Sequence, residues 1–137
     1  MITKQPNLQI YHNQYEFIDE NGQQISSFEW KRSNNVLKDI CTGNFLACIG
    51  VFISEQLYKK HKFDENKELT GTEDWDFWLR VIADVKNIGK IDKVNSVIVD
   101  HSDRTMNNIN IDDLIKRRLY IINKIENSPD LKKVYQK

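Results

Sequence analysis

Apolar residues recur at helical spacing in the middle of the chain. The stripe stands at positions i, i+3, i+4 and i+7 and consists of Trp75, Trp78, Leu79 and Ile82. Thr70 and Glu73 have the Thr-x-x-Glu spacing of a capping box, and Glu73 and Asp74 place negative charge where the helix dipole favours it. The pattern predicts a core-facing helix that starts behind Thr70, ends near Val85 and carries two acids at its mouth.

Two other stretches have the composition of strands. Residues 8–19 and 23–30 are separated by a turn that contains Asn21-Gly22, a pair that supplies positive φ, so we expect a hairpin. Residues 90–100 form a β-branched run that predicts one or two strands. Residues 45–53 are almost continuously apolar, which indicates a buried segment, although periodicity does not distinguish strand from helix there.

Capping residues predict three further helices. Ser33 or Asn34 would start a short helix that runs through Cys41, and Ser54 would start another that reaches His61. Asn110 would cap a final amphipathic helix that stops before Pro129 and leaves a charged tail. Strands and helices mix without a βαβ repeat. The fold class we expect is therefore α+β, with a small, mainly antiparallel sheet and flanking helices.

Charge and length exclude some classes of function. The chain has 137 residues, enough for one domain, and its formal net charge is zero, which argues against a general nucleic-acid binder. No apolar run approaches the roughly 18 residues that a membrane-spanning helix needs. The only cysteines, Cys41 and Cys48, do not have the spacing of a common zinc or thioredoxin motif, so we interpret them as reduced thiols.

The order of the motifs adds a resemblance. Phe63-Asp64-Glu65 precedes Glu73-Asp74, apolar residues and Leu79-Arg80, and a later strand ends in His101-Ser102. Over residues 8–107 this order resembles the second half of a family 2 glycosyltransferase of the GT-A fold. The resemblance implies a partial GT-A-like fold over residues 1–109 that lacks the N-terminal nucleotide-binding half. Residues 110–137 would add the amphipathic helix and the tail.

The chain departs from the family pattern in two places. Lys60-His61-Lys62 stands where the family usually has glycines before Phe-Asp-Glu. The Asp-x-Asp metal motif belongs to the missing half, and Asp74-Trp75-Asp76 does not replace it. Residues two apart on a helix point about 200° from one another, so these two carboxylates cannot chelate one ion.

The resemblance implies specific roles for the acids and their neighbours. Asp74 would be the catalytic base that deprotonates the acceptor hydroxyl. Glu73 would cap the helix or orient the acceptor. Trp75 would offer a stacking surface for a sugar or belong to the core. Asp76 and Arg80, at i and i+4, form a structural ion pair in this interpretation.

Two residues of the later loop would face the donor. By resemblance, His101 would ligate a divalent metal, Mn²⁺ or Mg²⁺, in the intact enzyme, or simply be a loop residue. Arg104 would meet phosphate in bidentate fashion or stay solvated. No cofactor is firmly expected for this chain alone.

The function we predict is the acceptor-side part of an inverting nucleotide-sugar glycosyltransferase, one that builds a bacterial surface polysaccharide in the cytoplasm or at the inner face of the membrane. Its partners would be an NDP-sugar donor and a sugar acceptor, and we expect no nucleic acid. Alone, the chain should bind donor weakly and lack transferase activity. Two alternatives are a non-catalytic module that pairs with another chain or self-associates through an exposed sheet edge, and an unrelated α+β binding domain.

Overall fold

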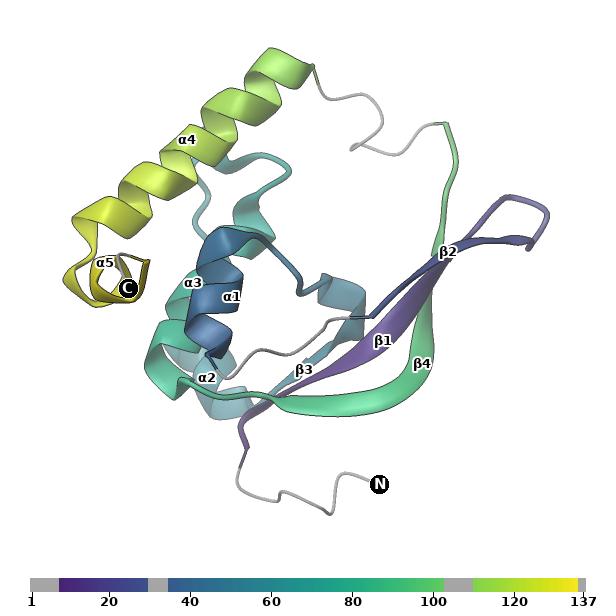
Figure 1. Cartoon of the computed structure of the whole chain (residues 1–137), viewed down its shortest axis with the longest axis horizontal. Coiled ribbons are helices and arrows are strands. Elements are labelled where there is room, and N and C mark those ends of the chain that lie inside the picture. Colours follow the sequence, from purple (N-terminus) through teal and green to yellow (C-terminus); the bar gives the residue numbers. More distant parts are fainter. Residues whose placement is uncertain (1–7, 30–34, 103–109, 136–137) are drawn as a thin grey trace.

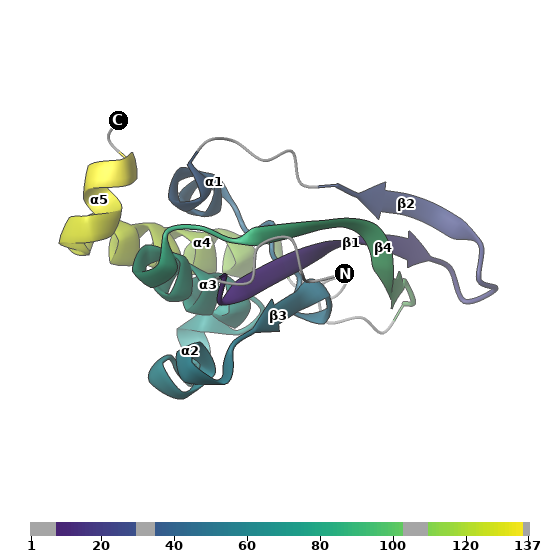
Figure 2. The same cartoon turned by 90° about the horizontal axis from the view of Figure 1, so that it is seen from below.

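The computed structural model describes residues 8–29, 35–102 and 110–135. Its four strands are β1 Ile10–Ile18, β2 Gln24–Phe28, β3 Val51–Ile53 and β4 Gly89–Val99. The α-helices are α1 Val36–Thr42, α2 Glu55–Lys60, α3 Glu73–Val85, α4 Ile111–Asn127 and α5 Pro129–Tyr135. Two 3₁₀ turns, η2 Cys48–Gly50 and η3 Lys67–Leu69, complete the described elements. The fold is α+β, as expected, with the helices gathered toward one end of the strands in both views (Figures 1 and 2).

The sheet is built around β1. On one side, β1 pairs antiparallel with β2 near its end and with β3 near its start, and on the other side it pairs in parallel with β4. The β1–β4 ladder runs from Tyr11 to Ile18. The predicted hairpin is confirmed, but the mainly antiparallel description is wrong, because the longest pairing is parallel and the sheet is mixed. The β-branched run that predicted one or two strands forms the single strand β4, whose register against β1 shifts between Asn13 and Tyr15.

A close contact fixes where β4 begins. Gly89 lies against the ring of Tyr11, and a Cβ at this position would come within 2.3 Å of Tyr11 Cδ1. Only glycine fits there, since real Cβ atoms do not approach ring carbons so closely. The parallel crossover from α3 into β4 therefore depends on this residue.

One apolar core joins the helices to the inner side of the sheet. The tryptophan stripe of α3 is buried as predicted, together with Ile10, Ile40, Leu46, Leu69, Ile88, Ile121 and Ile125. The prediction for residues 45–53 holds only in part. Phe45 and Leu46 are buried, but Ile49 and Phe52 are more than half exposed, because η2 and the short β3 turn their side chains outward.

Two of the predicted helix caps are confirmed, those of α2 and α4. The side chain of Ser54 accepts from Leu57 N at the start of α2, which ends at Lys60, one residue earlier than predicted, and that of Asn110 accepts from Asp112 N at the start of α4. For α1 the cap is Asn35, whose Oδ1 accepts from Lys38 N. The predicted caps Ser33 and Asn34 lie outside the described residues.

The capping box at Thr70 is wrong. The Thr70 hydroxyl donates to the Lys67 carbonyl, because Lys67–Leu69 form a 3₁₀ turn that ends at this residue. Gly71 then takes a positive φ of 78°, so the chain bends and α3 begins only at Glu73, behind Thr72. The predicted end at Val85 is confirmed, and Lys86 follows in the left-handed conformation.

The last segment also differs from its prediction. Residues 129–135 were expected to be a charged tail, but they form α5, with Pro129 at its first position where a missing N–H costs nothing. Leu131 of α5 belongs to the same core as Ile121 and Ile125 of α4. Among the helices in the described ranges, none has the length and apolar character needed to cross a membrane.

Candidate functional site

A groove lies between the inner side of the sheet, the start of α3 and the side of α4. Its volume is about 470 Å³. Asp74 and Trp75 line it from α3, and Leu114 and Arg118 line it from α4. The remaining lining comes from Tyr15, Phe17, Thr42, Gly43, Asn44, Leu46, Ala47, Gly71, Thr72 and Ile98. The walls thus combine apolar and aromatic side chains with polar and charged ones, among them Asn44, Asp74 and Arg118.

Asp74 is the half-buried carboxylate of this groove. Its Oδ2 accepts from Asn44 Nδ2 at 3.0 Å, and its Oδ1 accepts from the Trp75 backbone N–H at 2.7 Å. Burial raises the pKa of Asp74 above its ordinary value of 3.8, and the neighbouring Glu73 acts in the same direction. The two hydrogen bonds lower that pKa but do not cancel the effect of burial. The carboxylate is therefore more basic than an exposed one.

Asn44 holds Asp74 in place, and sequence reasoning missed it. The Oδ1 atom of Asn44 accepts from Leu46 N at 3.1 Å, so its NH₂ group must face Asp74. The loop that carries Asn44 follows α1, thirty positions before Asp74. The only sequence signal was Thr42-Gly43-Asn44, which reads as a helix break.

Trp75 combines a buried ring with a place in the groove lining. Its Nε1 donates to the Ile40 carbonyl at 2.7 Å, which anchors α3 to α1. Only 9% of the residue is exposed, so most of the indole serves the core. Tyr15 lines the groove too and is equally buried, with 8% of the residue exposed; its ring stacks on Phe28 at 4.9 Å. Burial, and then the charge of Asp74, raises the pKa of the Tyr15 phenol.

Glu73 and Arg104 were the other residues predicted to bind substrate. Glu73 is exposed in the first turn of α3 and does not line the groove. Arg104 lies outside the described residues. Arg118 of α4, which the sequence gave no reason to single out, supplies the cation at the groove instead.

His101 follows β4 and lines a separate concavity of about 310 Å³ with Asp19, Glu20, Asn21, Asp100 and Ser102. Across the three described ranges, no group of three or more His, Cys, Asp or Glu side chains has the arrangement of a metal site. The residues seen here thus do not fit a complete divalent-metal centre. A ligand role for His101 stays a prediction that needs further ligands from elsewhere.

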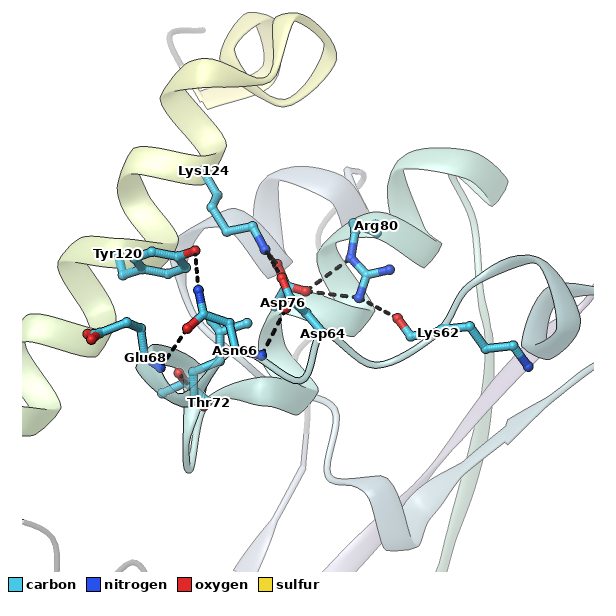
Figure 3. Close-up of polar contacts among 10 residues, drawn as sticks. Lys62, Asp64, Asn66, Glu68, Thr72, Asp76, Arg80, Tyr120 and Lys124 are labelled. Carbon is cyan, nitrogen blue, oxygen red and sulfur yellow. Dashed lines mark hydrogen bonds and ion pairs between the residues drawn. The ribbon is translucent and has the colours of Figure 1, made fainter.

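Asp76, two residues after Asp74, does not line the groove and lies between Arg80 and Lys124 (Figure 3). Its side chain is only 3% exposed, and its Oδ2 accepts from Arg80 Nη2 at 2.9 Å, which confirms the predicted ion pair. Lys124 of α4 lies 2.6 Å from the other oxygen of Asp76 and 2.9 Å from Asp64. Asp76 therefore joins α3, α4 and the preceding loop, and it is not available as a ligand beside Asp74.

The Phe63-Asp64-Glu65 segment belongs to the same network. The ring of Phe63 stacks on Phe77 of α3 with centroids 4.4 Å apart, and Arg80 donates to the Lys62 carbonyl at 2.7 Å. Ion pairing and a backbone hydrogen bond lower the pKa of Asp64. Phe63 and Asp64 of the motif thus fix the loop before α3 against α3 and α4.

Comparison with known proteins adds no family to this geometry. No protein-family model matches the chain, and no curated protein sequence matches it.

Proposed function

We propose that the chain is the acceptor-side part of an inverting nucleotide-sugar glycosyltransferase of the GT-A type, with Asp74 as its catalytic base. The observation that carries this proposal is the position of Asp74: a half-buried carboxylate of raised pKa that lines a groove of about 470 Å³ beside aromatic side chains. The order of Phe63-Asp64-Glu65, Glu73-Asp74 and Leu79-Arg80 supports the same function through its resemblance to family 2 enzymes.

The reaction is one in-line displacement at the anomeric carbon of the donor sugar. The acceptor oxygen forms the new bond to that carbon while the bond to the nucleoside diphosphate breaks and its electron pair leaves with the phosphate. Asp74 takes the hydroxyl proton as the bond forms. A base of raised pKa holds this proton better, and the hydrogen bonds from Trp75 and Asn44 favour the ionised form that must accept it.

In this proposal the chain contributes the acceptor side only. By the resemblance, a nucleotide-binding half would hold the diphosphate and its divalent metal. Arg118 lines the groove and would bind a phosphate or an acidic acceptor there. The bacterial polysaccharide and the cytoplasmic face of the membrane remain part of the proposal through the resemblance alone.

Calorimetric titration tests whether the chain binds the acceptor but not the donor. Acceptor sugars, as mono- and disaccharides, should bind in the millimolar range, and Asp74→Ala should weaken this binding, whereas Asp113→Ala, on the exposed first turn of α4, should not. UDP-sugars with Mn²⁺ should bind weakly or not at all. Tight binding of a UDP-sugar, or no effect of Asp74→Ala, would contradict the proposal.

The outer edge of β4 favours a second candidate function. In this candidate the chain is a non-catalytic module that associates with another chain. Among the described elements this strand pairs only with β1, so its outer edge is open. Val97 and Val99 are nearly half exposed on the side opposite Ile98, which lines the groove. An open edge with apolar neighbours is a template for pairing.

Light scattering after size-exclusion chromatography distinguishes the two candidates. Association through β4 predicts a dimer or larger species that Val97→Lys converts to monomer. The matched control is Ile115→Lys, which removes an exposed apolar residue from α4 instead. A monomer at all concentrations would exclude self-association through β4.

A further inference from the structure

The loop after α1 places an amide directly beside the carboxylate of the groove. Asn44 Nδ2 lies 3.0 Å from Asp74 Oδ2, and Asn44 Oδ1 is held by the Leu46 N–H at 3.1 Å. With Oδ1 fixed in this way, the amide cannot flip without losing both bonds. An amide nitrogen carries two hydrogens, and the bond to Asp74 uses one of them.

The second hydrogen is available to a ligand. Asn44 is exposed and lines the same groove as Asp74, so both groups are open to whatever occupies it. Side by side they offer an N–H donor and a carboxylate acceptor. A hydroxyl is the group that satisfies both, because it donates one hydrogen bond and accepts others.

We infer that Asn44 and Asp74 form one subsite for a sugar hydroxyl, in which Asn44 positions both the base and the acceptor. The hydroxyl donates its proton toward Asp74 and accepts from the second hydrogen of Asn44, which aims an oxygen lone pair away from Asn44 for attack. The hydrogen bond from Asn44 also favours the ionised form of Asp74, the form that a base needs. This inference rests on the proposed function, since it deepens the acceptor role of the groove.

Two isosteric substitutions test the inference. Asn44→Asp keeps the oxygen that accepts from Leu46 N–H but loses the NH₂ group. Asn66→Asp is the matched control, because Asn66 Oδ1 accepts from Glu68 N at 3.0 Å and its Nδ2 donates to the Tyr120 hydroxyl at 2.9 Å (Figure 3), and Asn66 is not among the residues that line the groove. Asn44→Ala is a second variant, which removes the donor without adding charge.

The readouts are the carboxyl ¹³C titration of Asp74 and the Kd for methyl glucoside and methyl galactoside, both by NMR. Both Asn44 variants should raise the pKa of Asp74 above its wild-type value and weaken sugar binding about tenfold, the loss expected for one hydrogen bond. Asn66→Asp should change neither. Unchanged values in both Asn44 variants would overturn the inference.

The outcomes separate this inference from the proposed function. If the wild-type chain binds no acceptor sugar, the proposed function fails, whereas the pKa of Asp74 in the Asn44 variants still decides whether Asn44 positions the carboxylate. If the wild type binds sugar and only the Kd, not the pKa, responds to Asn44, the positioning role is wrong although the acceptor groove stands.

Discussion

Asp74 and Asp76 are separated by one residue on the same helix and have opposite surroundings. Asp74 lines an open groove and is held by neutral donors, whereas Asp76 is enclosed by Arg80 and Lys124. The helix alone produces this difference, since residues two apart point in nearly opposite directions. The pair shows that one short motif can carry a structural ion network on one side of a helix and a candidate reactive group on the other.

The largest effect should follow removal of the enclosed acid. Asp76→Ala leaves Arg80 and Lys124 without their shared partner, and we expect a loss of about 3 kcal/mol in the free energy of unfolding. The value lies at the low end for a buried pair, because Lys124 keeps Asp64 and Arg80 keeps the Lys62 carbonyl. Urea denaturation measures the loss. A stability equal to that of Asp74→Ala would erase the contrast between the two acids.

A buried histidine, His12, makes the stability of the whole chain depend on pH. Burial and the charge of Lys90 lower the pKa of His12 to about 4, so the folded chain keeps this imidazole neutral. In the unfolded chain it binds a proton below about 6.5, so stability should fall between about pH 6.5 and pH 4, by on the order of 2–3 kcal/mol. His12→Phe, placed between the rings of Tyr15 and Phe45, should flatten this slope. Urea midpoints at several pH values measure it, and an equally steep slope in the variant would assign the pH effect to another group.

Lys124→Met should have a smaller effect than Asp76→Ala. Burial opposes the charge of Lys124, but its bonds to Asp76 and Asp64 raise its pKa overall, so the ammonium stays charged. Methionine keeps the apolar stem, and Asp76 retains Arg80, so we expect a loss of about 1–2 kcal/mol. Thermal unfolding checks this. A loss as large as that of Asp76→Ala would mean that Lys124, not Arg80, is the main partner of Asp76.

Asp74→Asn should produce the smallest change, in the opposite direction. A carboxyl whose folded pKa is raised costs stability above that pKa, and this cost vanishes as pH falls below the unfolded value of 3.8. The variant should therefore be more stable at neutral pH, by roughly 0.5–2 kcal/mol, and equal to the wild type in acid. Denaturation at pH 7 and pH 3 tests the sign. Destabilisation at pH 7 would show that Asp74 supports the fold.

The sequence predicted those parts that depend on local chemistry. The hairpin followed from Asn21-Gly22, helix α3 from its tryptophan stripe, and the Asp76–Arg80 pair from i, i+4 spacing. The parallel β1–β4 pairing could not be predicted in this way, because it depends on long-range register and on the fit of Gly89 under Tyr11. Helix α5 was missed because Lys132 and Lys133 made its short run look like a solvated tail.

The candidate site was predicted less completely than the fold. Asp74 was found through its motif, and the rejection of Asp74-Trp75-Asp76 as a metal site agrees with the separate surroundings of the two acids. Asn44 and Arg118 reach the groove from elements far away in the chain, and nothing near them in sequence marks them as site residues. Thr70 was misassigned because a capping spacing does not reveal a preceding 3₁₀ turn.

The central claim is that Asp74 meets an acceptor hydroxyl while Asp76 does not. The most direct test follows the carboxyl ¹³C signals of all aspartates by NMR while an acceptor sugar is added at neutral pH. The account predicts a saturable shift at Asp74 and none at Asp76. A sugar that binds with Asp74 unmoved, or that moves Asp76 instead, would contradict it.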